Sequence, residues 1–322
     1  MSEFELIDTY CRGIGPKHNS TVIDVGDDAA VFRPTGNKDL AVSTDTMVEG
    51  IHFLAGTDAS HLGHKILNVN CSDMAAMGAE PKYATLSLTM PSMDAAWLQR
   101  FSDSLKQQAE YFNVQLIGGD TTKGTLTLSL TIIGLVNKDK IISRSGAKLG
   151  DDVYVSNVLG DAALGLASLQ GQLQLPKEFS QAVELAHNRP QARVELGQAL
   201  LEIANAGLDI SDGLVADLGH VCSQSEVGVD LELSAMPLSP SYRHYLYQGG
   251  NYDSALFGGD DYELAFCCSP RRSNEVNALS DSLGLSLTKI GTVVDNEANA
   301  VRLFNNGKLV SMLDSHGFNH FS

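Results

Sequence analysis

Three short motifs place aspartates beside apolar runs in the first half of the chain. They are Gly26-Asp27-Asp28, Ser43-Thr44-Asp45-Thr46 and Gly118-Gly119-Asp120-Thr121-Thr122. Taken alone, each motif is typical of an ordinary turn or an Asx cap. Each adjoins a run typical of a β-strand, however, and strand ends on one side of a sheet converge in space. Carboxylate oxygens without His or Cys are the ligands that Mg²⁺ prefers, so the motifs predict a magnesium site.

A fourth aspartate lies within a helix predicted over His61–Gly78. Its helical spacing places it on one stripe with apolar residues. The stripe consists of Leu62, Ile66, Val69, Asp73 and Met77. An ionised carboxylate on an apolar face is costly unless it is paired or bound to a cation. Asp73 is therefore a candidate metal ligand, and the alternative is that it caps a neighbouring loop through hydrogen bonds.

The second half of the chain repeats this pattern. An apolar segment here leads up to an apparent helix, and two carboxylates and a hydroxyl lie just before that helix. Its sequence is Leu208-Asp209-Ile210-Ser211-Asp212-Gly213. Asp209 alternates with apolar neighbours, as in a buried strand, whereas Asp212 could serve only as a helix N-cap. Gly258-Gly259-Asp260-Asp261 precedes a further strand, and its alternative reading is a hairpin loop.

Known phosphate-binding motifs are absent from the sequence. It contains no P-loop, no G-x-G-x-x-G and neither protein-kinase signature, H-R-D or D-F-G. A phosphate chemistry would then depend on bound Mg²⁺ and isolated basic residues. Arg144, in Ser143-Arg144-Ser145-Gly146, is the best placed of these, and its alternative role is a salt bridge at a domain boundary.

Composition restricts the possible partners. A formal net charge of −17 over 322 residues repels polyanions, so nucleic acid is a poor candidate. The five cysteines include no C-x-x-C pair, which disfavours structural zinc and a disulfide framework. Met1–Arg12 has no basic n-region, and no apolar run approaches the roughly 18 residues of a membrane span. We expect a soluble, cytoplasmic protein without a membrane partner.

Helical and strand patterns alternate in both halves, which favours sheets covered by helices. Helices are predicted near the start from Ser2 and over His61–Gly78, Asp94–Phe112, Asp161–Gln170, Pro190–Ala206 and Ser273–Leu283. Strands are predicted at Ala29–Phe32, Leu40–Ser43, Ala84–Met90, Val114–Ile117, Leu126–Val136, Val153–Val155, Tyr262–Cys268 and Leu287–Val294, with a closing hairpin of Val301–Phe304 and Lys308–Met312. The glycine- and serine-containing stretch Ser143–Asp152 predicts a boundary between two domains, residues 1–142 and 143–322.

The ordered motifs resemble thiamine-monophosphate kinase, of the superfamily that includes aminoimidazole ribonucleotide (AIR) synthetase and selenophosphate synthetase. The resemblance runs nearly end to end. Besides the motifs above, it rests on Asn70-Cys71-Ser72-Asp73-Met74-Ala75-Ala76-Met77-Gly78-Ala79. It implies an AIR-synthetase-like (PurM-like) fold of mixed α/β and α+β class. The N-terminal ATP- and magnesium-binding α/β domain would pair its sheet across a homodimer, and a C-terminal α+β sandwich would close the active-site cleft.

The resemblance also implies roles for single residues. Magnesium ions, several in number, would be bound by Asp28, Ser43, Thr44, Asp45, Asp73, Asp120, Asp209 and Asp212. Of these, the catalytic carboxylates would be Asp45, Asp73, Asp120 and Asp212. The co-substrate ATP would meet Tyr111, Gly119, Asp120, Arg144 and Ser211, and the acceptor would meet His52, Asp260 and Phe318.

Four of these assignments have ordinary alternatives or depart from the family pattern. Tyr111 could be a core aromatic at a helix end, His52 a surface or core histidine, and Phe318 a packing residue. Asp260 stands where the family pattern has Glu, so its carboxylate is shorter by one methylene.

The family activity would be direct transfer of the ATP γ-phosphoryl group to thiamine monophosphate, giving thiamine diphosphate and ADP. The acceptor phosphate has a second pKa of about 6, by analogy with phosphoproteins, and needs no strong general base. Two alternatives are another ATP-dependent synthetase of the superfamily and a non-catalytic protein that binds divalent cations. The sequence lacks a D-x-[DN]-x-[DN]-G calcium loop, which disfavours the second alternative.

Overall fold

The computed structural model of the chain describes residues 9–10, 12–19, 21–23, 31–32, 38–137, 140–295 and 300–313. The chain divides into two compact units, Met1–Met74 with Ala79–Ile141, and Ala75–Gly78 with Ile142–Ser322. The candidate metal ligand Asp28, the candidate acceptor contact Phe318 and the start of the predicted N-terminal helix lie outside the described residues.

The first unit is built on a four-stranded sheet. Its strands in spatial order are β3 (Lys38–Val48), β6 (Thr127–Asn137), β4 (Glu80–Met90) and β5 (Gln115–Lys123). Only β4 and β5 run parallel, and β3 and β5 are the two edges of the sheet. A short pair, β1 (Thr21–Ile23) and β2 (Val31–Phe32), forms a separate ladder.

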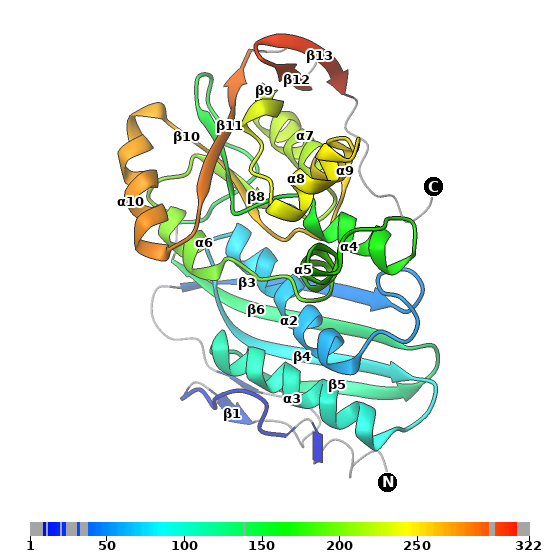
Figure 1. Cartoon of the computed structure of the whole chain (residues 1–322). Coiled ribbons are helices and arrows are strands. Elements are labelled where there is room, and N and C mark those ends of the chain that lie inside the picture. The colour runs from blue at the N-terminus through cyan, green and yellow to red at the C-terminus, as the bar shows by residue number, and fades with distance from the viewer. Residues whose placement is uncertain are drawn as a thin grey trace. The chain divides into compact units, whose positions relative to one another are not determined.

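Helices α2 (Ala59–Ala76) and α3 (Ala95–Tyr111) cover one face of this sheet (Figure 1). The covered face is apolar in its central strand, where Leu128, Leu130 and Ile132 are fully buried at alternate positions. Helix α3 begins at Asp94, whose carboxylate accepts hydrogen bonds from the N–H groups of Ala96 and Trp97.

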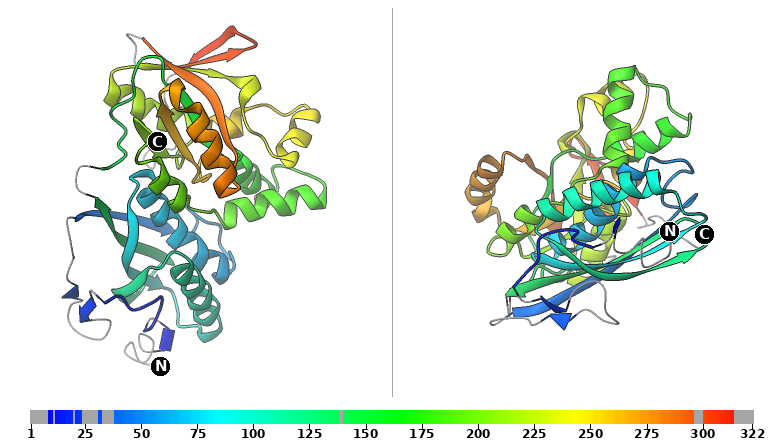
Figure 2. Two further views of the ribbon diagram at one scale, coloured as in Figure 1. Left: turned by 90° about the vertical axis from the view of Figure 1, so that its left-hand side faces the viewer. Right: turned by 90° about the horizontal axis from the view of Figure 1, so that it is seen from below.

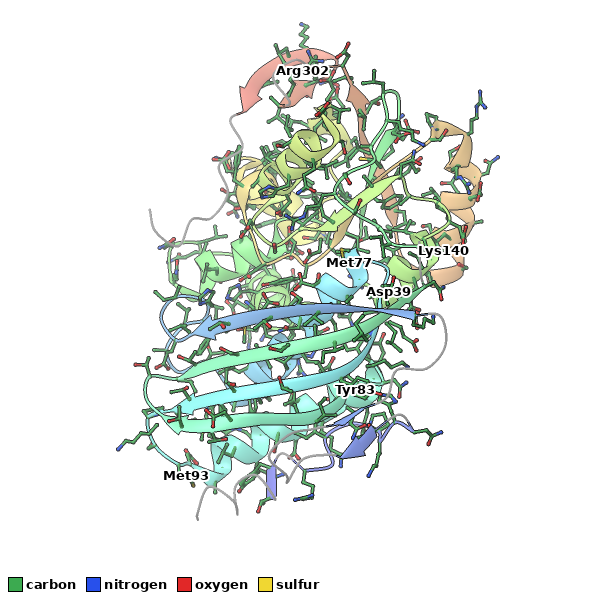
Figure 3. The ribbon with its side chains drawn as sticks, turned by 180° about the vertical axis from the view of Figure 1, so that it is seen from behind. Asp39, Met77, Tyr83, Met93, Lys140 and Arg302 are labelled. Atoms are coloured by element: carbon green, nitrogen blue, oxygen red, sulfur yellow. The ribbon has the colours of Figure 1, made fainter. Side chains whose placement is uncertain are left out.

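The other face of the sheet carries small polar and β-branched side chains. Figure 3 views it from the side opposite α2 and α3, and no described helix of this unit crosses the strands there. Hydroxyl groups form a row of cross-strand pairs, with Thr44 Oγ1 2.8 Å from Thr131 Oγ1 and Thr46 Oγ1 2.7 Å from Ser129 Oγ. Val42, on the same face of the edge strand β3, is 61% exposed.

The second unit contains a seven-stranded sheet. In spatial order its strands are β13 (Lys308–Leu313), β12 (Val301–Asn305), β9 (Gly228–Glu232), β11 (Leu287–Val294), β7 (Asp152–Ser156), β10 (Leu264–Cys268) and β8 (Ala206–Asp209). All neighbouring pairs are antiparallel except β12 and β9.

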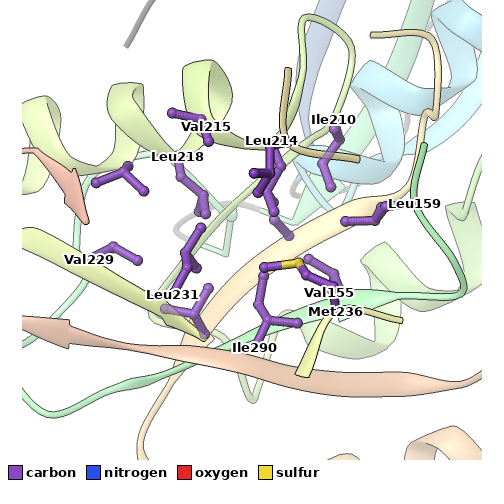
Figure 4. Packing of buried hydrophobic residues seen from close by; sticks show 14 of the residues in the cluster. Val155, Leu159, Ile210, Leu214, Val215, Leu218, Val229, Leu231, Met236 and Ile290 are labelled. Atoms are coloured by element: carbon purple, nitrogen blue, oxygen red, sulfur yellow. The ribbon is translucent and has the colours of Figure 1, made fainter. Parts of the chain in front are cut away.

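The helices of this unit are α4 (Asp161–Leu169), α5 (Lys177–Asn188), α6 (Val194–Leu200), α7 (Leu214–Ser225), α8 (Pro240–Tyr247), α9 (Asp253–Phe257) and α10 (Ser273–Leu283). Helix α7 packs against β8, β9 and β12, whereas α10 lies on the opposite face beside β11 (Figures 1 and 2). Leu214 and Leu218 of α7 pack into the core with Val155, Val229 and Leu231 of the sheet (Figure 4). This core holds the start of α7 in place.

Most elements agree with the sequence patterns, including α10, β11 and the closing hairpin. The helix predicted over Pro190–Ala206 is wrong in extent: only Val194–Leu200 is α-helical, and Ala206 begins strand β8. Pairing with β10 explains the difference, because Ala206 and Gly207 stand opposite Cys267 and Phe266 in the ladder. Tertiary pairing here overrides a helical pattern. Helices α5, α8 and α9 and strand β9 were not predicted.

No helix in the described part of the chain is long and apolar enough to cross a membrane.

Candidate active site

One group of predicted ligands comes together where β3 passes α2. Ser43 and Asp45 are two residues apart on β3, so both side chains lie on the face that α2 covers. Ser43 Oγ donates a hydrogen bond to Asp73 Oδ2 at 2.5 Å. The backbone N–H of Asp45 donates to the side-chain oxygen of the fully buried Asn70, at 3.3 Å. The partner that Asp73 needed on its apolar stripe is thus a hydroxyl from the neighbouring strand, and Asp73 keeps some solvent exposure.

Thr44 points away from this group. Its hydroxyl belongs to the open face of the sheet and pairs there with Thr131. If Thr44 binds metal together with Ser43 and Asp45, its backbone carbonyl must be the ligand rather than its hydroxyl, because adjacent side chains on a strand face opposite ways.

Gly119 and Asp120 lie within β5, at the other edge of the sheet. A Cβ atom on Gly119 would stand 1.9 Å from the carbonyl oxygen of Leu86, so only glycine permits this close pairing. Asp120 pairs with Ser87, and both are exposed. The expectation that Asp45 and Asp120 follow the ends of strands is therefore wrong, since both lie inside edge strands.

The sheet keeps Asp45 and Asp120 apart. Two strands, β6 and β4, separate β3 from β5. At a spacing of about 4.8 Å between strands, the two edges lie roughly 14 Å from each other. In register, Asp45 stands opposite the buried Leu130, whereas Asp120 stands opposite the exposed Ser87, so the two carboxylates also belong to different faces. A single copy of this sheet does not bring them to one metal ion.

Tyr111 and His52 occupy the ends of elements. Tyr111 is the last residue of α3 and is 69% exposed, which excludes the alternative of a core aromatic. His52 lies in the turn after β3, where its Nδ1 accepts a hydrogen bond from the N–H of Val48 at 3.0 Å. The neutral imidazole therefore carries its proton on Nε2, which makes Nε2 a hydrogen-bond donor.

In the second unit, Asp209, Ser211 and Asp212 come together between β8 and α7. Asp209 is the last residue of β8 and is only 6% exposed. Ser211 and Asp212 form the loop that precedes α7, and Gly213 serves as the N-cap with a φ of 112°. A Cβ atom there would lie 2.8 Å from the carbonyl carbon of Phe257. Glycine is required on both counts.

A further carboxylate, Asp217, supports this loop. Its Oδ2 accepts hydrogen bonds from the backbone N–H groups of Ser211, Asp212 and Gly213, each at 3.1 Å. Burial raises the pKa of Asp217 to about 7, and the negative charges of Asp209 and Asp212 add to the rise. The charges of Asp209 and Asp212 give this loop a negative potential, which is suited to a cation.

Asp260 lies on a segment that pairs with the same loop. The N–H groups of Asp260 and Tyr262 donate to the carbonyl oxygens of Ser211 and Ile210, at 2.9 and 2.8 Å. The Tyr262 hydroxyl donates to Asp260 Oδ1 at 3.2 Å, and His187 Nδ1 lies 3.4 Å from Asp260 Oδ2. Sequence reasoning missed both partners. Tyr262 lies only two residues further along the chain, which was a signal, whereas His187 on α5 carried none.

Glu263 fixes the end of this segment. Arg193 forms a two-pronged ion pair with it, from Nε to Oε2 at 2.8 Å and from Nη2 to Oε1 at 2.5 Å. Ser156 Oγ donates to the same carboxylate, as does Asn157 Nδ2 at 2.9 Å. The glutamate side chain is 5% exposed. The network holds the segment of Asp260 on the sheet.

Asp261 ties the same segment to α4. Its Oδ2 accepts a hydrogen bond at 2.7 Å from the N–H of Gly160, the N-cap residue of α4. Burial of the carboxylate raises the pKa of Asp261 well above its ordinary value. Asp261 thus takes the place of the missing cap side chain at Gly160.

Arg144 is exposed, in the segment that follows the first unit. Ser225, the last residue of α7, holds this segment: its hydroxyl donates to the carbonyl oxygen of Arg144 at 3.0 Å and accepts from the N–H of Gly146 at 3.1 Å. No salt bridge of Arg144 is found within the described residues, so the alternative of a boundary ion pair gains no support.

The donor set fits magnesium rather than a metal held by protein alone. Among the residues that the structure describes, no three His, Cys, Asp or Glu side chains are grouped closely enough to hold a metal ion. Mg²⁺ is usually bound by one or two carboxylates together with water and substrate phosphates. Asp45 with Asp73, and Asp209 with Asp212, match that mode of binding.

Family models match both halves of the chain. Residues 26–136 match the N-terminal domain of AIR synthase related protein, and residues 148–304 match its C-terminal domain. These matches and the solved structures below confirm the expected two-domain AIR-synthetase-like fold.

Full-length relatives include several thiamine-monophosphate kinases. The chain is 40% identical to thiamine-monophosphate kinase of Haemophilus influenzae over 322 residues, covering 100% of this chain and 98% of the relative. The crystal structure of thiamine-monophosphate kinase from Stenotrophomonas maltophilia is 38% identical, with a TM-score of 0.85, and covers 96% of this chain and 98% of that one. A structure of AaThiL complexed with AMPPCP and TMP is 34% identical, with a TM-score of 0.78, and covers 90% and 89%.

Proposed function

The chain belongs to the thiamine-monophosphate kinase family, and we propose on that premise that it transfers the γ-phosphoryl group of ATP to thiamine monophosphate, giving thiamine diphosphate and ADP. The observation that carries the proposal is the 40% identity that extends over the whole chain. AMPPCP is an analogue of ATP, so the complex of the related protein with AMPPCP and TMP supports both substrates. The reaction belongs to thiamine diphosphate biosynthesis, and we place it in the cytoplasm.

The proposed nucleotide contacts come from both units. Gly119 and Asp120 on β5, with Tyr111 at the end of α3, belong to the proposed N-terminal domain, residues 1–142. Arg144 and Ser211 belong to the proposed C-terminal domain, residues 143–322. The exposure of Tyr111 and Arg144 supports these roles, because both side chains are accessible to a ligand.

The proposed magnesium ligands in the described part of the chain are Ser43, Thr44, Asp45, Asp73, Asp120, Asp209 and Asp212, with Asp28 as a further one outside it. Bound magnesium would neutralise phosphate charge and orient the phosphoryl groups. The protein itself fixes the positions of these carboxylates through hydrogen bonds. Asn70 holds the backbone of Asp45, Ser43 orients Asp73, and Asp217 holds the backbone of Asp212 by accepting a hydrogen bond from its N–H.

The acceptor would be bound by His52, Asp260 and Phe318. The Tyr262 hydroxyl orients the Asp260 carboxylate, which supports a contact with a cationic or hydrogen-bonding ring. The acceptor phosphate is largely ionised at neutral pH and can attack the γ-phosphorus without a general base. We therefore propose direct in-line transfer, in which the oxygen of thiamine monophosphate forms the new bond to phosphorus as the bond to ADP breaks.

The proposal includes a homodimer in which each active site is shared. Asp45 and Asp120 lie on opposite edges and faces of one sheet, yet the proposed chemistry requires both. A second copy would supply Asp120, with Gly119, at the β3 edge of the first. The open sheet face, with its hydroxyl row and exposed Val42, supports pairing of two such sheets.

An acceptor panel tests the proposed activity. Purified protein is incubated with ATP, Mg²⁺ and, separately, thiamine monophosphate, an aminoimidazole-type ribonucleotide precursor, selenide or no acceptor, and the products are separated by chromatography. Thiamine diphosphate should form only with thiamine monophosphate. Turnover of another acceptor would favour a different synthetase of the superfamily, and nucleotide binding without any turnover would favour a non-catalytic binder.

A further inference from the structure

Asp217 is buried beneath the loop that carries two of the proposed ligands. It lies in the first turn of α7, and its side chain is almost entirely removed from solvent, with the residue 3% exposed. One carboxylate oxygen accepts hydrogen bonds from three consecutive backbone N–H groups, those of Ser211, Asp212 and Gly213. The backbone N–H of Asp217 also donates to the carbonyl oxygen of Gly213, at 3.0 Å. The loop is therefore bonded to Asp217 both through its N–H groups and through the carbonyl oxygen of Gly213.

Three amides that converge on one point form a concavity of the kind that binds phosphate in other proteins. Here the chain's own carboxylate fills the concavity. The loop then cannot offer these amides to a phosphate while Asp217 holds them, and it offers the side chains of Ser211 and Asp212 instead. This arrangement agrees with the absence of a P-loop from the sequence.

The loop follows a path that needs glycine at one position, and such a tie limits the backbone freedom that glycine adds. Gly213 has a φ of 112°, and the chain passes close to the backbone of Phe257 at this point. A buried carboxylate next to Asp209 and Asp212 is itself costly. Hydrogen bonds from three amides offset that cost, and a misplaced loop would lose all three together.

We propose that Asp217 is a positioning residue that locks Ser211–Gly213 in the conformation presenting Asp212 to magnesium and Ser211 to the nucleotide. The inference rests on the proposed function for the identity of the ligands. The hydrogen-bonding geometry of Asp217, rather than its charge, then determines how tightly the loop binds magnesium and the nucleotide.

Two variants separate geometry from charge. Asp217→Asn keeps an oxygen that can accept from the three amides but removes the charge, whereas Asp217→Ala removes the acceptor. A matched control is Asp230→Ala, which breaks the two hydrogen bonds of Asp230 to Arg302 on strands that carry no proposed ligand. If Asp217→Ala does not fold, Asp217→Glu replaces it, since it keeps the charge but displaces the acceptor by one methylene.

The first measurement is amide hydrogen exchange of metal-free protein, read on peptides that span residues 209–216. Losing the three hydrogen bonds should speed exchange of the loop amides about tenfold or more in Asp217→Ala, and less than about threefold in Asp217→Asn. The second is calorimetry with Mg²⁺ and AMPPCP. Asp217→Ala should raise the Kd about tenfold, Asp217→Asn should stay within about threefold, and Asp230→Ala should lower the Tm without changing the Kd.

Two results would overturn the inference: a folded Asp217→Ala protein with wild-type exchange and Kd, or an Asp217→Asn protein weakened as much as Asp217→Ala. The second result would mean that charge, not geometry, acts here. If the wild-type protein fails to bind AMPPCP with Mg²⁺, the proposed function fails, and the exchange measurement still decides whether Asp217 holds the loop.

Discussion

Asp73 shows how a single residue links the helix to the sheet. It lies on the stripe of α2 that Leu62 and Ile66 bury in the core, yet it keeps some exposure and accepts a hydrogen bond from Ser43. The cost of placing a carboxylate there is acceptable if a cation binds it in the working enzyme.

We predict that Asp73→Asn folds normally but loses activity by about a hundredfold or more, because a neutral amide is a poor ligand for Mg²⁺. Ser43→Ala removes only the orienting hydroxyl and should lose about tenfold. Turnover at saturating Mg²⁺, with circular dichroism to verify the fold, provides the comparison. Near wild-type turnover of Asp73→Asn would exclude Asp73 as a ligand.

Asp261 gives a prediction for stability against pH. Its pKa in the folded protein lies well above the ordinary value of 3.8, because the carboxylate is buried. The favourable contribution of the protonated group is therefore present below about pH 4 and is lost as the pH rises through the folded-state pKa. Asp261→Asn keeps an acceptor for the N–H of Gly160 and removes this loss.

The free energy of unfolding of Asp261→Asn, relative to wild type, should therefore increase between pH 5 and pH 8, by about 1 kcal/mol or more. Urea denaturation at several pH values measures it. If the free energy of unfolding of Asp261→Asn instead fell relative to wild type as the pH rises, the carboxylate would be ionised and stabilised in the folded protein.

At the scale of elements, the sequence located the carboxylates but not the geometry of their strands. Alternation and turn signals identified β3 and β5, yet both strands run on through their aspartates, to Val48 and Lys123. Polar edge strands lack the apolar alternation that marks a buried strand, so their true ends leave little signal. The order of strands, which sets Asp45 and Asp120 apart, depends on pairing that no local pattern encodes.

Helix α5 and the partners of Asp260 were missed for a similar reason. His187 and Arg193 acquire their roles only because the chain folds back beside the segment of Asp260 and Glu263. By contrast, the path from β8 into α7 was recognisable, since Asp209 and Gly213 bracket a strand-to-helix passage. Helix α7 then organises two regions, with Asp217 holding the loop at its start and Ser225 holding the segment of Arg144 at its end.

The Glu263 network should dominate the stability of this region. We predict that Glu263→Gln lowers the free energy of unfolding by about 3 kcal/mol, because it leaves the largely buried Arg193 without its counter-charge. Asp230→Asn, which weakens the more exposed pair with Arg302, should cost less than about 1 kcal/mol. Urea denaturation compares the two. Equal losses would contradict the special role given to the buried network.

At the scale of the whole molecule, the proposed dimer makes a prediction about mixed proteins. Asp45→Asn and Asp120→Asn should each be inactive as homodimers. If Asp120 acts from the partner, subunit exchange between the two variants yields heterodimers with one intact and one doubly altered site. Random assortment then restores about a quarter of wild-type activity.

The mixture is prepared by mild denaturation and refolding, and light scattering verifies that it is dimeric. Refolding each variant alone provides the control. If Asp45 and Asp120 act from the same chain, every site in the mixture carries one substitution and no activity returns, which would contradict the shared site.

The central claim is direct phosphoryl transfer to an acceptor that is itself a phosphate. The chain offers carboxylates for metal ions but no assigned base to take the proton of an alcohol, so thiamine should be a poor acceptor and thiamine monophosphate a good one. The decisive measurement is incubation with γ-labelled ATP and each acceptor in turn, followed by chromatography and a denaturing gel. The label should appear in thiamine diphosphate alone, with none retained on the protein. Efficient labelling of a product from free thiamine, or a labelled protein band, would contradict the account.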